Sequence, residues 1–165
     1  MTLTAKVIII AAAVIVLTMA TYKTILKTFL PSVEGFSATP YWDYKQWSWG
    51  YGTKVPNSVN DPTNNPGGTI TESEAFAEAW RHLQTDYLYL KNLIYVPLSA
   101  NRWAALLSFS YNLGPANADN LVININSHND AALQSQWMAY VYAGGVVLPA
   151  LIDRRAKEWA LWMKG

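Results

Sequence analysis

The spacing of the hydrophobic positions changes along this chain. Residues 7–22 form an uncharged and mostly apolar run. From Tyr41 to about Thr53 aromatic and small residues alternate, which predicts a short β-hairpin. Beyond residue 70 the apolar residues recur every three or four positions, which is the spacing of one helix face. The pattern therefore predicts an α+β fold, with a small β-containing lobe followed by a mostly helical lobe.

The first long helix is predicted to begin at a capping box. In TESE (71–74), Thr71 is the expected N-cap and Glu74 occupies the N3 position. The apolar stripe that follows consists of Phe76, Trp80, Leu83, Tyr87 and Leu90. Further helices are expected at 101–112, 116–126, 129–142 and 149–163. Residues 24–33 favour a linker that runs into a short helix, with Pro31 in its first turn.

The N-terminal apolar run lies between Lys6 and Lys23. As a helix its sixteen residues would span about 24 Å, which is less than the roughly 30 Å hydrocarbon core of a bilayer. Three interpretations stay open: a cleaved export signal, a permanent anchor, or a weak anchor that later leaves the membrane. We expect a signal or signal-anchor segment at 1–23 and one folded domain at 24–165. The protein would be exported, and first tethered to the inner membrane through residues 7–22.

Composition limits the chemistry that is open to this domain. Without the two leader lysines, 10 basic residues stand against 11 acidic ones, so the charge gives no support for binding nucleic acid. The chain contains no cysteine and only two histidines, His82 and His128. A disulfide framework is therefore excluded, and a Ser-His-Asp triad is disfavoured. We expect no metal and no cofactor, with His82 on a helix surface and His128 in a turn.

Two carboxylates flank the start of the predicted β-lobe. Glu34 precedes a glycine, and Asp43 follows nine positions later, before the aromatic hairpin. If Glu34 ends a helix and Asp43 begins a strand, both can face one cleft between the lobes. One such carboxyl can donate a proton to a departing glycosidic oxygen while the other stabilises the oxocarbenium-like transition state. On these residues alone, a solvated surface pair stays the alternative. The aromatic segment 42–49 could stack on sugars or form hairpin core.

Several motifs, in their order along the chain, resemble those of the phage-type lysozymes, glycoside hydrolase family 24, which are the endolysins of tailed phages. The catalytic segment of that family is similar to EG at 34–35, Asp43, Ser48 and GYGT at 50–53. Its later motifs are similar to ITESEA (70–75), ALLSFSYNLG (105–114) and LIDRRAKEWALWMKG (151–165). The resemblance covers about residues 25–165. It implies a lysozyme-like fold of two lobes, a small β-hairpin lobe and a larger helical lobe, with the active-site cleft between them.

The resemblance also implies roles for individual residues. Glu34 would be the general acid and Asp43 the second carboxylate. Ser48 would replace the catalytic threonine of the family, keeping its hydroxyl but not the methyl group that restricts the rotamer. Asn112 would bind the saccharide. Arg155, in the last helix, would pair with the carboxylate of Glu34.

Together these roles imply an endolysin that hydrolyses the β-1,4 bond between N-acetylmuramic acid and N-acetylglucosamine in peptidoglycan, as a monomer, for lysis of a bacterial host. The leader resembles that of signal-anchor-release endolysins. Thr53 stands where the family has a histidine, so we expect a contact between the lobes to be lost. Three alternatives stay open: a wall-binding module that is catalytically impaired, a lytic transglycosylase, and a membrane-anchored interaction protein.

Overall fold

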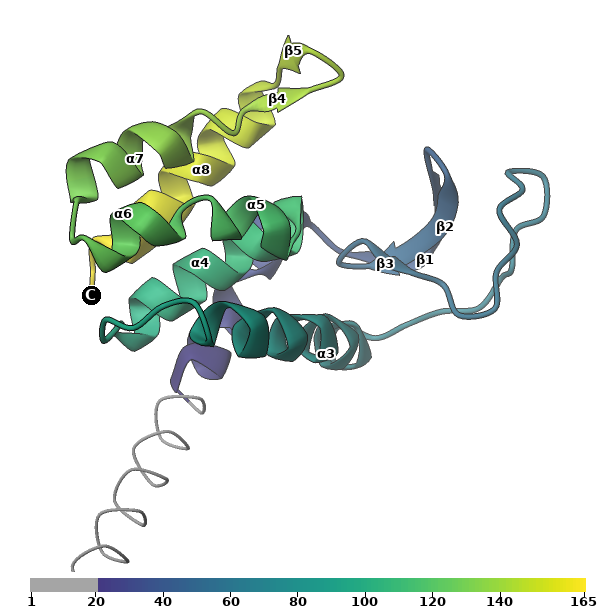
Figure 1. The fold of residues 1–165 in the computed structure, drawn as a ribbon. Coiled ribbons are helices and arrows are strands. Elements are labelled where there is room, and N and C mark those ends of the chain that lie inside the picture. Colours follow the sequence, from purple (N-terminus) through teal and green to yellow (C-terminus); the bar gives the residue numbers. More distant parts are fainter. Residues whose placement is uncertain (1–20) are drawn as a thin grey trace, which may run out of the picture.

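One long helix joins two groups of elements (Figure 1). The structure is a computed structural model that describes residues 21–165. In chain order its elements are α2 (Pro31–Glu34), β1 (Ser37–Asp43), β2 (Gln46–Gly50), β3 (Thr53–Lys54), α3 (Glu72–Lys91), α4 (Ala100–Leu113), α5 (Pro115–Asp119), α6 (Val122–Asn126), α7 (Asp130–Met138), β4 (Tyr142–Ala143), β5 (Val146–Val147) and α8 (Pro149–Trp162). Strands β1–β3 form the small lobe, and α3 extends from it into the helical lobe. The α+β, mostly helical fold is confirmed.

The small lobe is an antiparallel sheet with the strand order β1-β2-β3. Its register pairs Tyr41 with Ser48 and Asp43 with Gln46 across the β1–β2 hairpin. The predicted hairpin is therefore present, although β1 begins at Ser37 and a third short strand follows. Trp47 is buried, and its ring packs edge-on against that of Trp42. These two tryptophans belong to the core of the hairpin.

Helix α3 begins at the predicted capping box. The Thr71 hydroxyl accepts a hydrogen bond from the Glu74 amide, and the Glu74 carboxylate accepts one from the Thr71 amide at 2.9 Å. All five residues of the predicted apolar stripe are buried. Near its start α3 packs closely on β2, because a Cβ atom placed on Gly50 would lie 2.7 Å from Cβ of Ala75. Only glycine permits this approach, which fixes the sheet against the helix.

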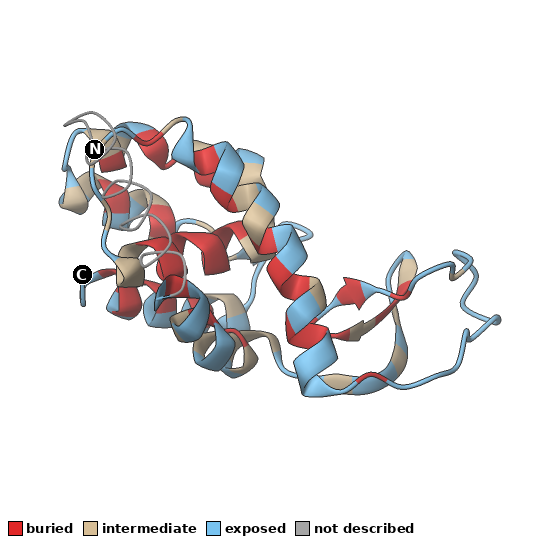
Figure 2. Cartoon of the chain, turned by 90° about the horizontal axis from the view of Figure 1, so that it is seen from below, coloured by how far each residue is buried: buried red, intermediate tan, exposed pale blue. Residues whose placement is uncertain are grey.

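Helix α4 lies at the centre of the helical lobe. Its eight consecutive residues from Trp103 to Ser110 are buried. A helix that is buried all round must be covered by neighbours on every side, and here α3, α5 and α8 pack against α4. In Figure 2 the buried positions concentrate where helices face one another. Aromatic rings join α4 to α7, since Phe109 contacts Trp137 at 4.8 Å between ring centroids.

The prediction of a linker at 24–33 is wrong. Residues 21–29 are helical, and a turn leads into α2, where Pro31 occupies the first turn as predicted. Tyr22, Leu26 and Leu30 are spaced by four residues and are completely buried. This spacing places them on one helix face, which packs on α3 through the rings of Tyr22 and Tyr87.

The predicted membrane segment lies outside the described residues except at its end. Tyr22, its last residue, belongs to the core of the folded domain. Within residues 21–165 no helix has the length and apolar character that crossing a membrane requires.

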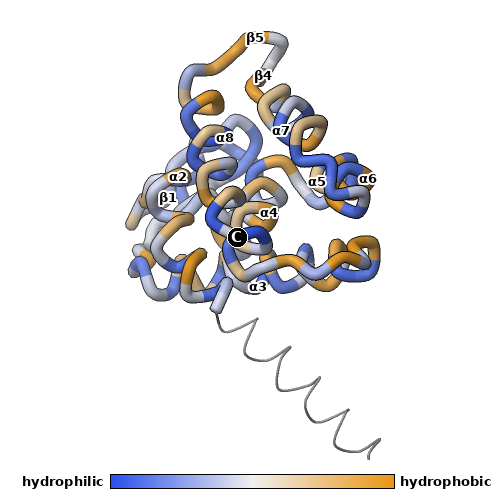
Figure 3. Tube along the Cα trace, turned by 90° about the vertical axis from the view of Figure 1, so that its left-hand side faces the viewer, coloured by the Kyte–Doolittle hydropathy of each residue, from blue (hydrophilic) through white to orange (hydrophobic). Residues whose placement is uncertain are grey.

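Two helices predicted in the C-terminal half have different bounds. The span 116–126 is divided into α5 and α6, and α7 ends at Met138, four residues before the predicted end at 142. The chain then forms the β4–β5 hairpin, in which Gly144 and Gly145 have φ angles of 58° and 80°. Two successive positive φ angles suit a two-residue hairpin turn, so this glycine pair ends the helical pattern. Figure 3 shows the hairpin projecting from the helical lobe. His128 lies in a turn with a φ of 54°, as predicted.

The packing of residues 21–30 predicts that their removal or truncation destabilises the whole domain. Leu26→Ala should lower the free energy of unfolding by about 2–5 kcal/mol, because it leaves a cavity in a fully buried site. The exposed neighbour Lys27 provides the control, since Lys27→Ala should change the free energy of unfolding by less than about 0.5 kcal/mol. Urea denaturation followed by tryptophan fluorescence measures both. Equal, small effects would show that this helix is not part of the folded domain.

Candidate active site

Glu34 lies at the junction of the two lobes, as the last residue of α2. The next residue, Gly35, has φ 71° and ψ 175°, a conformation that essentially only glycine adopts. This residue turns the chain out of the helix and towards β1. The glycine of the Glu-Gly motif therefore fixes where the Glu34 side chain leaves the backbone. That side chain is 16% exposed, so it is largely covered but reachable from solvent.

The carboxylate of Glu34 is held by an arginine of α8. Nη2 of Arg154 donates to Oε1 of Glu34 at 2.6 Å and also to the carbonyl oxygen of Ser108 at 3.0 Å. Burial alone would lower the pKa of Arg154, but the hydrogen bond and charge of Glu34, together with Glu158, outweigh it and raise the pKa. The guanidinium is therefore a permanent cation beside Glu34.

The expectation that Arg155 pairs with Glu34 is wrong, because Arg154 holds that position. Neighbouring residues of a helix point about 100° apart, so only one of the two arginines can face Glu34. Arg155 is fully buried, and its guanidinium lies over the ring of Phe109 at 4.8 Å. Its Nη2 donates to Oδ1 of Asn112 at 2.8 Å. The amide oxygen of Asn112 is thus already hydrogen-bonded within the protein. The predicted contact of Asn112 with the saccharide stays a prediction.

Glu158 binds both arginines from the next turn of α8. Its Oε1 accepts from Nε of Arg154 at 2.9 Å, and its Oε2 lies 2.9 Å from Nε of Arg155. Glu158 is completely buried, and it also accepts hydrogen bonds from the hydroxyl of Ser108 and the indole of Trp137. A buried carboxylate with this many donors is fully satisfied. It compensates one of the two buried cations and orients Arg154 towards Glu34.

Asp43 lies on the face of the sheet that also carries Tyr41, Gln46 and Ser48. Residues two apart on a strand share a face, and so do directly paired residues on neighbouring strands. Asp43 itself is exposed at the end of β1. Burial raises the pKa of the Tyr41 hydroxyl, and the charges of Asp43 and Glu34 raise it further. Tyr41 therefore lies within electrostatic reach of both carboxylates.

Ser48 shares the face of Asp43 but is not open to solvent. Its side chain is completely buried, and its hydroxyl accepts a hydrogen bond from Nε2 of Gln46 at 3.1 Å. Gln46 in turn pairs with Asp43 across the hairpin. A water beside the Ser48 hydroxyl would therefore require the Gln46 side chain to move.

The contact between the lobes that we expected Thr53 to lose is present. The Thr53 hydroxyl donates to Oε2 of Glu78 on α3 at 2.9 Å, and the indole of Trp49 donates to the same oxygen at 3.1 Å. A second bond crosses the junction where the Tyr111 hydroxyl of α4 donates to the carbonyl of Tyr51 at 3.0 Å. Neutral hydrogen bonds to one carboxylate thus join the sheet to α3 at Thr53.

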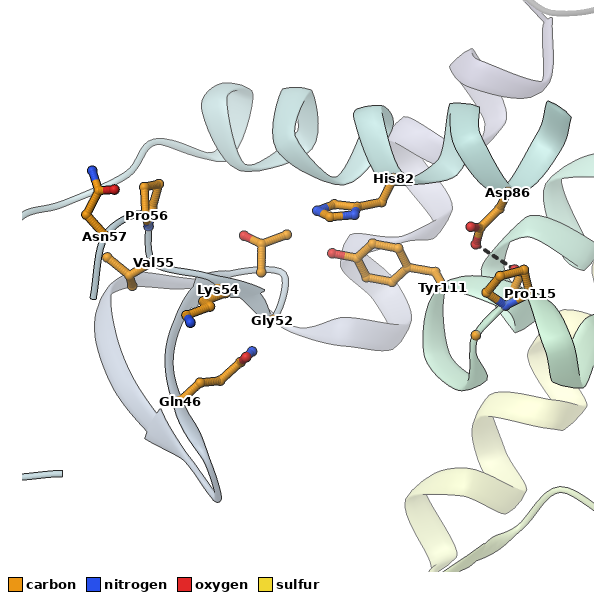
Figure 4. Close-up of a pocket in the computed structure, with 13 residues that line it drawn as sticks. Gln46, Gly52, Lys54, Val55, Pro56, Asn57, His82, Asp86, Tyr111 and Pro115 are labelled. Carbon is orange, nitrogen blue, oxygen red and sulfur yellow. Dashed lines mark hydrogen bonds between the residues drawn. The ribbon is translucent and has the colours of Figure 1, made fainter. Parts of the chain in front are cut away.

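A cavity of about 680 Å³ lies in the angle between the lobes (Figure 4). Gln46 and Lys54 line it from the sheet, and His82, Asp86 and Tyr111 line it from the helices. Glu34 and Asp43 are not part of its wall. Burial raises the pKa of Tyr111, and the charge of Glu34 adds to this effect. Tyr111, on the cavity wall, therefore lies within electrostatic reach of Glu34. Within residues 21–165 no cluster of potential ligands is suited to a metal ion.

The lysozyme-like fold consists here of two lobes joined by one helix, and Glu34, which is largely covered, lies at their junction. The sequence model of the family described as phage lysozyme matches residues 31–158, which is more than half of the chain. The chain belongs to the phage lysozyme family. A comparison with curated proteins gives no match.

Solved structures resemble the chain over most of its length. The muramidase domain of SpmX from Asticaccaulis excentricus has a TM-score of 0.72 and 23% identity, over 84% of this chain and 95% of that one. An endolysin from Escherichia coli O157:H7 phage FAHEc1 has a TM-score of 0.69 and 21% identity, over 87% and 90% of the two chains. A mutant of P22 lysozyme has a TM-score of 0.69 and 25% identity, over 84% and 94%. These likenesses confirm the fold.

Sequence reasoning missed four residues of this site: Tyr41, Glu78, Arg154 and Glu158. One signal was available, since Glu158 follows the arginine pair at the i+3 and i+4 spacings that bring side chains of a helix together. The other contacts depend on tertiary packing. Glu78 meets Thr53 across 25 residues, and Arg154 meets Glu34 across 120.

The buried charges make Glu158 the residue whose loss should cost most. Glu158→Ala leaves two buried guanidinium groups without their shared carboxylate, and should lower the free energy of unfolding by about 3–5 kcal/mol. The control on the same helix is Asp153→Ala, which removes the exposed ion pair with Lys157 and should cost about 0.5 kcal/mol or less. Thermal unfolding measured by circular dichroism compares the two. Similar losses would contradict the role assigned to Glu158.

Proposed function

We propose that this protein is a muramidase. It would hydrolyse the β-1,4 bond between N-acetylmuramic acid and N-acetylglucosamine in peptidoglycan, and so act as an endolysin in the lysis of a bacterial host. The main support is the placement of Glu34, a largely covered carboxyl at the junction of the lobes that accepts a hydrogen bond from Arg154. Membership of the phage lysozyme family supports the same reaction class.

In this mechanism Glu34 is the general acid. Its carboxyl donates a proton to the glycosidic oxygen as the bond from that oxygen to C1 breaks. The carboxylate that results accepts a hydrogen bond from Nη2 of Arg154, which is fixed by Ser108 and Glu158 before the reaction begins. The arginine thus stabilises the charge that develops during proton transfer, at no cost of reorganisation.

Asp43 is the second carboxylate in this proposal. Its negative charge stabilises the oxocarbenium-like transition state, and it receives a proton from the water whose oxygen bonds to C1. Ser48 could hold that water once Gln46 has moved away from its hydroxyl, because both residues share the sheet face of Asp43. Asn112 contributes to saccharide binding through its amide nitrogen, since its oxygen is bonded to Arg155.

The N-terminal segment would deliver the enzyme to its substrate. Peptidoglycan lies outside the inner membrane, so a domain that cleaves it must be exported. The apolar residues 7–22, flanked by Lys6 and Lys23, support export with an initial tether to that membrane. In this proposal residues 1–23 form the signal-anchor segment and residues 24–165 the catalytic domain, together with Tyr22, which packs in its core.

Replacement of the proposed acid tests the reaction. Glu34→Gln should lower the rate at which purified cell walls lose turbidity by about 10²–10⁴-fold, because the amide cannot donate the required proton. The amide oxygen can still accept from Arg154, so the fold is retained. Glu72→Gln, an exposed glutamate in the first turn of α3, is the matched control and should leave the rate unchanged.

Two outcomes of this experiment would contradict the proposal. If the unmodified protein binds walls but releases no fragments, the chain is a wall-binding module. If it releases muropeptides, mass spectrometry identifies the reaction, since hydrolysis adds water and leaves a reducing muramic end. An anhydro end would instead assign a lytic transglycosylase.

A further inference from the structure

The folded domain begins inside the N-terminal apolar run. That run covers residues 7–22, and its last residue, Tyr22, is completely buried in the core of the domain. The ring centroid of Tyr22 lies 5.0 Å from that of Tyr87 and 5.7 Å from that of Trp80, both on α3. The run and the domain thus share residues, and no linker separates them. If the run is held in a bilayer, the surface around Tyr22 must lie at that bilayer.

The surface around Tyr22 belongs to the end of the helical lobe at which three helices meet. Tyr87 lies near the end of α3, and its ring packs edge-on against that of Trp103, near the start of α4. Asn101 of α4 donates to the carbonyl oxygen of Lys164, just after α8. The start of α3 packs on β2, so this surface lies at the opposite end of α3 from the small lobe (Figure 1). We call it the distal end, and its exposed side chains include Lys23, Lys91, Tyr95, Met163 and Lys164.

The segments that meet at the distal end carry basic side chains and no acidic ones. No Asp or Glu occurs in residues 21–33, 87–118 or 159–165. The basic residues of these segments are Lys23, Lys27, Lys91, Arg102 and Lys164. Arg102 is paired with Asp130 of α7 at 3.5 Å, but none of the ion pairs within residues 21–165 includes one of the four lysines. Their positive charges therefore suit an anionic partner.

Two of these lysines are held beside the point at which the chain enters the domain. Nζ of Lys23 lies 4.8 Å from the ring centroid of Trp80, and Nζ of Lys91 lies 5.8 Å from that of Tyr87. Both rings contact Tyr22, so the two ammonium groups flank it. A lysine whose stem lies along an apolar surface, with its charge at the edge, is typical of the boundary between a bilayer and water.

Two large apolar side chains are exposed among the lysines of the distal end. Tyr95, in the loop after α3, is 81% exposed, and Met163, at the end of α8, is 57% exposed. The amide of Tyr95 donates to Oδ1 of Asn126 at 3.1 Å, which fixes the loop on α6. Tyrosine is enriched at membrane interfaces. A stable protein interface takes roughly 20–30 residues a side, whereas a few lysines suffice for anionic headgroups, so a lipid surface fits the distal end better.

We propose that the distal end binds the anionic phospholipid headgroups of the membrane that holds the N-terminal segment. Lys23, Lys91 and Lys164 contact the headgroup phosphates, and Tyr95 lies in the interface. The proposal rests on the membrane tether that forms part of the function proposed above, but not on the cleavage reaction. Since β1–β3 lie at the other end of α3, the small lobe is then directed away from the bilayer (Figure 1).

A single fluorescent label tests this contact in the full-length chain, because the chain contains no cysteine of its own. Tyr95→Cys is labelled with an NBD dye, and the protein is reconstituted into vesicles whose lipids carry a spin label on the headgroup. The dye should be quenched in vesicles that contain phosphatidylglycerol, and little in vesicles of phosphatidylcholine alone. The control is Asn64→Cys, in the exposed loop between β3 and α3, which should stay unquenched in both.

Loss of two lysines gives the quantitative test. Lys91→Gln combined with Lys164→Gln should lower the ratio of bound to free distal ends about 25-fold, since each lysine near an anionic surface contributes about fivefold. Lys45→Gln, in the exposed turn between β1 and β2, should leave the ratio unchanged. Quenching that is equal in both kinds of vesicle, or that survives the double substitution, would overturn the proposal. So would a dye that is shielded without quenching as the protein per vesicle increases, because a second copy would then cover the distal end.

The same preparations separate this proposal from the muramidase function. Glu34→Gln should leave the quenching unchanged, because Glu34 is not part of the distal end. Quenching in a protein that cleaves no cell walls would support the lipid contact and overturn the muramidase. Wall cleavage by a protein whose dye is never quenched would overturn the lipid contact alone. A chain that does not float with the vesicles would overturn the tether and the lipid contact together.

Discussion

The site depends on the ion pairs that the buried carboxylate of Glu158 forms with two arginines. Two adjacent arginines of α8 enter the helical core, and a buried guanidinium is tolerated only when its charge is compensated. Glu158 contacts both guanidinium groups and compensates one of their two charges, and it also accepts hydrogen bonds from Ser108 and Trp137. As a consequence, Arg154 is fixed before any substrate arrives, and its Nη2 group donates to the carboxylate of Glu34. The carboxyl of Glu34 is thus tied to the packing of the core.

Much of the fold could be predicted from the sequence, because its helices have clear apolar stripes and caps. The capping box at Thr71 fixed the start of α3 within one residue. The errors occurred where another signal was stronger. Tyr140 and Tyr142 continue the aromatic pattern of α7, but the glycine pair at 144–145 turns the chain into a hairpin. Residues 24–29 follow directly on the apolar leader, and the sequence pattern predicted a linker there although the chain is helical from residue 21 to residue 29.

The site was predictable in its residue types rather than in its contacts. The motif around Glu34 and Asp43 indicated two candidate carboxylates, and the backbone conformation of Gly35 explains why a glycine follows Glu34. The sequence could not decide between two neighbouring arginines, since both lie in the same helical turn and only the packing of α8 on α4 determines which one faces Glu34. Thr53 shows the same limit, because its partner Glu78 belongs to a different element and has no motif of its own.

The two candidate carboxylates are held in unequal ways. Glu34 is fixed by Arg154 to the core, whereas Asp43 stands near the exposed end of a hairpin whose position depends on the contacts of the small lobe with α3 and α4. The separation of the carboxylates is therefore set by the angle between the lobes. The cavity lies inside that angle and has walls from both lobes, so a ligand bound there contacts the sheet and the helices at once. Any ligand held there therefore lies across the junction that the Thr53–Glu78 and Tyr111–Tyr51 hydrogen bonds maintain.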